Sequence, residues 1–380
     1  MINRITEQFR TLFKRNPDFS YFAPGRVNLI GEHTDYNDGF VFPCAIEYGT
    51  YMAVGKRPGS VMRVVAGNFS EDYSEWSLTD DIVRSEDSPW SNYLRGVCVA
   101  LQEKGHTLSG LDVYVEGNVP RGAGLSSSAS LSVAFAGACS EANGLQLDVS
   151  TQALVAQQAE NDFAGCSCGI MDQLASAGGQ EGRALLIDCQ SLTFERFPIP
   201  EALTLMIIDS RVERQLVGSE YNDRRVDCER AAEHLQVKSL RGADMTLLNQ
   251  HKGQLDDLAY RRARHVITEN ERTVAAAQAL ASTDYQTLNA MMKASHVSMR
   301  DDFEITIPEI DFIVSTVEQH LDEDGGVRMT GGGFGGCVIA LVPNNKAQAI
   351  EEQVTQAYAQ EYGRDCKVYM CYAAQGARVL

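Results

Sequence analysis

The run from Gly122 to Ser130, GAGLSSSAS, has the residue types that bind phosphate. It follows residues 111–120, where apolar and polar residues alternate as in a strand, and it precedes a proline-free run typical of a helix. Gly122 and Gly124 let backbone N–H groups approach a phosphate closely. The serines fall at the first helical turn, where free N–H groups and the helix dipole favour negative charge. We therefore predict an anion site, in which a serine hydroxyl can also bind magnesium.

This loop differs from the common nucleotide-binding motifs. The Walker A pattern GxxxxGK[ST] is absent from the chain, and so are the HRD and DFG motifs of protein kinases. A helix N-cap with a flexible serine loop is the alternative interpretation. The position directly after a predicted strand favours the phosphate site.

A second stretch, residues 21–43, places polar side chains between two apolar runs, VNLI and FVFP. A strand with so many polar groups does not bury well alone, so the stretch is either a surface turn or the lining of a polar pocket. The apolar runs on both sides favour the pocket. The polar residues of the whole stretch are Arg26 and Asn28, before and within the first run, and Glu32, His33, Asp35 and Asn37 between the runs.

Other residues stand out further along the chain. Asp172 lies in an apolar frame, one turn inside the helix predicted from residue 168, which disfavours a capping role. Trp90, at the start of a predicted helix, is either a core residue or an aromatic that stacks on adenine. Glu160 lies near the end of a predicted helix over residues 151–165, and residues 331–336 form a second glycine-rich loop.

The length, net charge and segment composition of the chain limit its domain number, its partners and its location in the cell. At 380 residues it suits two domains, and a proline-containing segment, residues 191–202, suggests a boundary that gives domains 1–195 and 196–380. The net charge of −18 disfavours nucleic acid and anionic membranes as partners. The chain has no signal peptide pattern and no apolar stretch long enough to span a membrane. We therefore expect a cytoplasmic protein with reduced cysteines and no evident obligate protein partner.

The motifs together resemble those of the GHMP small-molecule kinases, over the part of the chain from residue 21 to residue 337. Within that group they are similar to the galactokinases. The resemblance implies two α+β domains with the active site in the cleft between them. The N-terminal domain would have a mixed sheet and the C-terminal domain an antiparallel sheet with helices. The matching runs are GRVNLIGEHTDYNDGFVFP, GLSSSASL, CGIMDQ, SEYNDRR and RMTGGGFGGC.

The resemblance also implies a role for each matching residue. Asp172 would face the sugar O1 as catalytic base, or only orient the hydroxyl, with Arg26 beside it. Ser128 and Glu160 would hold Mg²⁺, and Trp90 would lie near the adenine. The sugar-binding residues would be Glu32, His33, Thr34, Asp35, Gly169, Asp172 and Tyr221. The residues that wrap the triphosphate would be Gly122, Ala123, Gly124, Leu125, Ser126, Ser127 and Ser128.

The implied activity is phosphorylation of galactose at O1 by ATP, with Mg²⁺ as cofactor. An N-acetylgalactosamine kinase is one alternative, because the room at the sugar 2-position depends on the pocket volume. A non-catalytic sensor of galactose and ATP is the other. Relatives of that kind lack a Ser-Ala pair in the phosphate loop, whereas this chain has Ser128 and Ala129, which favours the enzyme.

Overall fold

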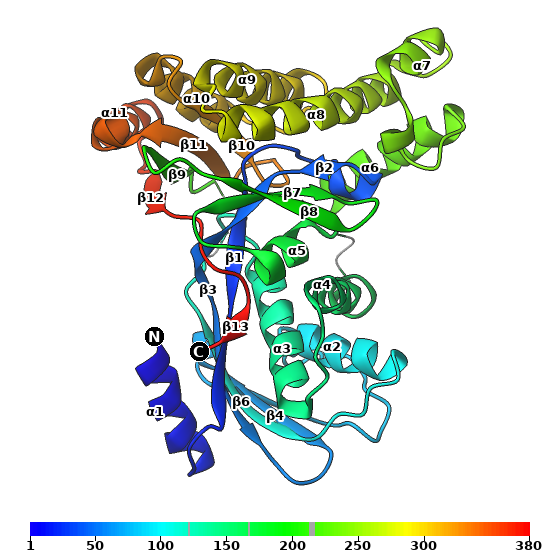
Figure 1. Ribbon diagram of the computed structural model, residues 1–380, viewed down its shortest axis with the longest axis vertical. Helices are drawn as coiled ribbons and strands as arrows, with labels where there is room; N and C mark the ends of the chain where they lie inside the picture. The colour runs from blue at the N-terminus through cyan, green and yellow to red at the C-terminus, as the bar shows by residue number, and fades with distance from the viewer. Residues whose placement is uncertain (121, 166–167, 213–216) are drawn as a thin grey trace.

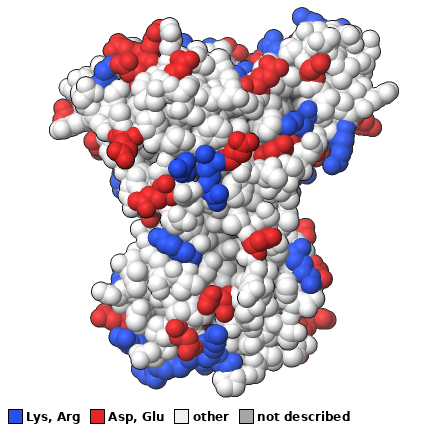
Figure 2. Space-filling model, in the orientation of Figure 1, with Lys and Arg blue, Asp and Glu red and all other residues white. Residues whose placement is uncertain are grey.

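The computed structural model describes residues 1–120, 122–165, 168–212 and 217–380. The chain forms two α+β halves stacked along the long axis of the molecule (Figure 1). The molecule narrows to a waist where the two halves meet (Figure 2). Mixed and antiparallel sheets occur in separate halves, which confirms the predicted fold class.

The N-terminal half is built on a six-stranded mixed sheet with the order β13-β1-β3-β6-β4-β5. Strands β4 and β6 pair in parallel, and β1 pairs antiparallel with β3. The strands are β1 (Phe19–Asn28), β3 (Pro43–Lys56), β4 (Val61–Ala66), β5 (Asp72–Ser77), β6 (Leu111–Gly117) and β13 (Arg378–Val379).

The alternation along β3 explains how helices cover both faces of this sheet. Met52 and Val54 pack in the core that includes Phe135 of α3, whereas Ala53 packs with Phe9 of α1 on the other face. The helices of this half are α1 (Ile2–Phe13), α2 (Ser91–Glu103), α3 (Ser127–Asn143), α4 (Val149–Gln158) and α5 (Met171–Gly178). Helix α4 continues as a π-helical turn, Ala159–Ala164.

The C-terminal half has a four-stranded antiparallel sheet with the order β10-β11-β9-β12, covered by long helices (Figure 1). Its strands are β9 (Leu203–Asp209), β10 (Gly326–Thr330), β11 (Cys337–Pro343) and β12 (Lys367–Cys371). Its helices are α6 (Val217–His234), α7 (Met245–Gln250), α8 (Asp257–Ala281), α9 (Tyr285–Asp301), α10 (Pro308–Leu321) and α11 (Asn344–Tyr362).

A third sheet lies between the two halves in Figure 1, in the order β2-β7-β8. It consists of β2 (Phe40–Val41), β7 (Arg183–Asp188) and β8 (Thr193–Pro198), so the segment predicted as a boundary contains an edge strand. The C-terminal strand β13 returns to the first half and pairs with β1. The division at residue 195 remains a prediction.

Two findings concern the chain as a whole. Within the described ranges, no helix is long and apolar enough to cross a membrane. The cysteines of the same ranges are free thiols, and most of them are buried.

Candidate active site

An ion pair between Arg26 and Asp172 forms the centre of the site. Arg26 lies on β1 just after a register shift at Pro24, and Asp172 lies in the first turn of α5. Arg26 Nε donates to Asp172 Oδ1 at 2.6 Å, and Arg26 Nη2 donates to Asp172 Oδ2 at 2.8 Å. Burial alone would lower the pKa of Arg26, but the carboxylate of Asp172 raises it, so the guanidinium stays charged. This two-pronged contact fixes the orientation of the Asp172 carboxylate.

The predicted phosphate loop forms hydrogen bonds with this ion pair. Arg26 Nη1 donates to the carbonyl of Gly124 at 2.8 Å, and the Ser126 hydroxyl donates to Asp172 Oδ2. Gly122 and Gly124 have φ angles of 77° and 71°, and Ser126 has a φ of 60°. These left-handed conformations turn the chain sharply before α3 begins at Ser127, as the glycines predicted.

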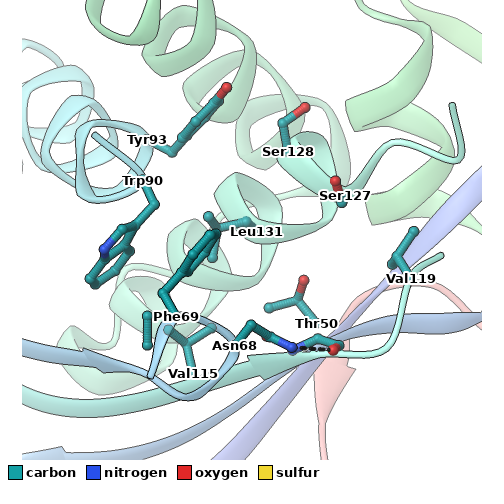
Figure 3. A pocket seen from close by; sticks show the side chains of 12 residues that line it. Thr50, Asn68, Phe69, Trp90, Tyr93, Val115, Val119, Ser127, Ser128 and Leu131 are labelled. Carbon is teal, nitrogen blue, oxygen red and sulfur yellow. Dashed lines mark hydrogen bonds between the residues drawn. The ribbon is translucent and has the colours of Figure 1, made fainter. Parts of the chain in front are cut away.

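A cavity of about 210 Å³ extends from the start of α3 to an aromatic pair. Figure 3 shows Ser127 and Ser128 at one end of this cavity and Phe69 with Trp90 at the other. The rings of Phe69 and Trp90 are nearly parallel, with an interplanar angle of 11° and centroids 6.4 Å apart. Trp90 is half-buried, and its Nε1 donates to Asp72 Oδ2 at 2.6 Å. The cavity therefore joins an aromatic surface to a group of hydroxyls.

The two predicted metal ligands differ in their surroundings. Ser128 lines the cavity near the start of α3, and Glu160 is buried in the π-helical turn after α4. Gln173 of α5 donates from Nε2 to Glu160 Oε1 at 2.9 Å. A hydroxyl and a carboxylate are hard oxygen donors, which suit Mg²⁺ when phosphates and water complete the coordination.

His33 is held as a neutral imidazole. Burial lowers its pKa to about 3, and the nearby charges of Arg224 and Arg328 add to this effect. His33 Nε2 lies 3.4 Å from the carbonyl of Gly332, which can only accept, so Nε2 carries the proton. The other ring nitrogen, Nδ1, then accepts from the Tyr36 hydroxyl at 2.8 Å. The ring also lies 5.0 Å from that of Tyr221, so the structure brings these two predicted sugar ligands together.

Asp35 and Gly169 are in close contact. A Cβ atom on Gly169 would lie only 2.0 Å from Asp35 Oδ2, so a larger residue there would displace the carboxylate. Both residues border a polar cavity of about 220 Å³. Burial, followed by the negative charge of Asp172, raises the pKa of Asp35 from 3.8 to about 6.

The side chains of Glu32 and Thr34 form hydrogen bonds with other groups of the protein. Glu32 Oε1 accepts from the backbone N–H of Gly331 at 2.9 Å and from Thr330 Oγ1 at 3.1 Å. It also lies 3.3 Å from Nη1 of the buried Arg328. The Thr34 hydroxyl lies 3.0 Å from the carbonyl of Gly31 and 2.6 Å from that of Phe40, and the side chain is buried. A sugar contact for either residue remains a prediction.

The second glycine-rich loop, residues 331–336, meets the first half of the molecule at this site. Gly332 lies beside both His33 and the ring of Tyr221, where a Cβ atom would be 3.3 Å from Tyr221 Cδ2. Just after the loop, Cys337 Sγ lies 3.0 Å from the carbonyl of Ala123. The two glycine-rich loops are thus neighbours in space, which the sequence analysis did not predict.

Sequence reasoning missed several residues of the site. Phe69 and Tyr93 line the aromatic cavity, and Phe303 packs on His33 with centroids 4.8 Å apart. Ala123 and Leu125 of the phosphate loop are buried in the core, so only their backbones are available for a ligand. No motif marks Phe69 or Phe303, because their positions result from long-range packing.

Three family models match the chain. The galactokinase galactose-binding signature matches residues 7–56, the N-terminal domain of GHMP kinases matches residues 92–180, and the C-terminal domain of GHMP kinases matches residues 276–360. In chain order, the matched ranges contain the predicted sugar ligands of residues 32–35, the phosphate loop with Asp172, and the second glycine-rich loop.

Solved structures agree with these matches. A Lactococcus lactis galactokinase complexed with galactose is 31% identical, with 100% of both chains covered and a TM-score of 0.94. A Methanococcus jannaschii mevalonate kinase is 15% identical, with 94% of this chain and 98% of that chain covered and a TM-score of 0.66. A Cytophaga hutchinsonii homoserine kinase is 17% identical, covers 95% and 97%, and has a TM-score of 0.62. At these low identities, the last two similarities show only that the fold is shared.

Proposed function

The chain belongs to the galactokinases, a branch of the GHMP kinases, and from that premise we propose how its residues phosphorylate galactose at O1. The products are galactose 1-phosphate and ADP. ATP binds in the cavity of Figure 3, with adenine near Trp90 and Phe69 and the phosphates at Ser127 and Ser128. The sugar binds beside Asp35, Gly169 and the ring of His33.

The fixed carboxylate of Asp172 is the observation that carries this proposal. Phosphoryl transfer needs positioning, charge neutralisation and an acceptor for the hydroxyl proton. Arg26 and Ser126 hold the carboxylate in place next to the phosphate loop. Asp172 therefore accepts the O1 proton as the new O–P bond forms. The Arg26 guanidinium already donates hydrogen bonds to Asp172 and to the carbonyl of Gly124, so its main role is to orient the base.

The oxygen donors of the site, the Ser128 hydroxyl and the Glu160 carboxylate, suit Mg²⁺. Ser128 and Glu160 would hold it together with the phosphate oxygens. When bound, the ion neutralises charge on the triphosphate, for which the described part of this loop offers no lysine. Gln173 holds Glu160 in place through its amide. The cysteines in the described part of the chain are free and mostly buried, which supports a reducing cytoplasm as the place of the reaction.

A coupled ADP-release assay over a panel of sugars tests the proposal. We expect turnover with galactose, and a kcat/KM for glucose lower by about 10⁴, because an epimeric hydroxyl leaves buried polar groups unpaired. Turnover of N-acetylgalactosamine at the same or a higher rate would instead identify an N-acetylgalactosamine kinase. Binding of galactose and ATP without ADP release would identify a sensor.

A further inference from the structure

The sugar loop, residues 29–40, is folded back on itself and buried against the C-terminal half. Gly31 has a φ of 98°, and a Cβ atom there would lie 2.7 Å from the carbonyl of Phe40. His33 has a φ of 61°, a conformation that costs a non-glycine residue energy and persists only when its surroundings hold it. The loop therefore depends on partners outside itself.

Helix α8 supplies these partners from one face. His265, Glu269 and Thr273 are spaced four residues apart, so they form a single stripe toward the loop. Glu269 Oε1 accepts from the backbone N–H of Gly31 at 3.0 Å and lies 3.4 Å from the N of Glu32. His265 Nε2 lies 3.1 Å from the carbonyl of Glu32.

The carboxylate of Glu269 is itself held in a fixed position. Its side chain is fully buried, and its Oε2 accepts from Arg272 Nε at 2.7 Å. The Ser295 hydroxyl of α9 donates to Oε1 at 2.6 Å. Burial raises the pKa of Glu269, but the charge of Arg272, the other positive groups nearby and the hydrogen bond from Ser295 together outweigh burial and lower the pKa to about 2. An ionised acceptor thus faces two backbone N–H groups, which gives strong hydrogen bonds.

We propose that Glu269 is a positioning residue for the sugar site. Its carboxylate fixes the backbone at Gly31 and Glu32, and the fixed backbone sets the direction in which His33 and Asp35 face the sugar. At the far end of the loop Asn270 Oδ1 accepts from the N–H of Phe40 at 2.8 Å, so α8 holds both ends. The inference rests on the proposed function, because it assigns the loop to galactose.

Glu269→Gln tests the inference in the full chain, since it keeps the side-chain shape and removes the charge. We expect the galactose dissociation constant, measured by calorimetry without ATP, to rise about 10–100-fold, because small misplacements of binding groups cost that much. We expect the KM for ATP to stay within about twofold. Hydrogen exchange over residues 27–40 should become faster.

Asp112→Asn is the matched control. Asp112 is another buried carboxylate with arginine partners, bonded to Arg15 at 2.9 Å and Arg63 at 2.6 Å, but it lies on β6 under α1. This variant should lose thermal stability and keep the wild-type galactose affinity. A comparable rise in the galactose dissociation constant in both variants would overturn the inference, because the effect would then be global.

The other possible outcomes also test the role of Glu269. A folded Glu269→Gln protein with wild-type galactose affinity and wild-type exchange would overturn the inference. If Glu269→Gln does not fold, Ser295→Ala removes one donor from the same oxygen and should give a smaller change in the same direction; no change would overturn the inference. Wild-type protein that does not bind galactose would defeat the proposed function, whereas the exchange measurement would still decide whether Glu269 holds the loop.

Discussion

Replacement of Asp35 by Asn should stabilise the unliganded protein while it destroys sugar binding. The fold raises the pKa of Asp35 through burial and the negative charge of Asp172, so the ionised carboxylate is held in an unfavourable place. Asn keeps the shape of the side chain and can still accept from the backbone N–H of Tyr36, as Asp35 Oδ1 does at 3.0 Å. The variant removes the charge and keeps the local turn.

The magnitude follows from the pKa. The rise from 3.8 to about 6 corresponds to about 3 kcal/mol, at about 1.36 kcal/mol per pKa unit. Because the side chain borders a cavity, solvent screening reduces this to about 1–2 kcal/mol. The folded protein holds the proton more tightly than the unfolded chain, so wild-type stability falls as pH rises between about 4 and 6. The advantage of Asp35→Asn should therefore be absent near pH 4 and complete above about pH 7.

Thermal melting of both proteins across this pH range is the assay. We expect the melting temperature of the variant to exceed that of the wild type by about 1–3 °C above pH 7, and to match it near pH 4. Asp284→Asn is a control, because Asp284 is an exposed helix cap whose pKa is lowered by Thr287, and its difference from wild type should be flat over this range. A variant less stable than wild type above pH 7 would refute the reasoning.

Two further predictions concern the nucleotide. Glu160→Gln should weaken the magnesium dependence of ATP binding, measured by titrating ATP with and without the metal; an unchanged dependence would mean that Glu160 is not a ligand. Trp90→Leu should raise the KM for ATP about tenfold through loss of the aromatic surface and leave the KM for galactose near its wild-type value. An unchanged KM for ATP would place the adenine elsewhere.

Local sequence patterns predicted much of the fold and the central part of the site. Alternation over residues 111–120 indicated the strand before the phosphate loop, and the glycines at 122 and 124 marked the left-handed turns that the structure has. The helix that contains Asp172 was also indicated, but α5 begins at Met171 rather than at residue 168, so Asp172 lies in its first turn and not one turn inside it. Each of these features is formed by residues that are close together in the chain, so it can be predicted from the local sequence.

Long-range features could not be predicted in the same way. Strand β8 was hidden by the two prolines of its segment, of which only Pro198 belongs to the strand, at its end, where an edge strand tolerates proline. Strand β13 pairs with a strand more than three hundred residues earlier in the chain. The π-helical turn around Glu160 differs from an α-helix by one hydrogen-bond step, which residue propensities do not distinguish. Glu269 has no motif of its own, because its role arises only when α8 meets the sugar loop.

The turnover of Asp172→Asn, measured after its galactose and ATP affinities, tests the central claim most directly. If Asp172 accepts the O1 proton, the variant should bind both ligands and lose about 10²–10⁴ in kcat. Arg26 also loses its counter-charge in this variant, which adds to the decrease in kcat. A variant that binds galactose and ATP as the wild type does and retains kcat within about tenfold would contradict the account, because the hydroxyl would then need no base.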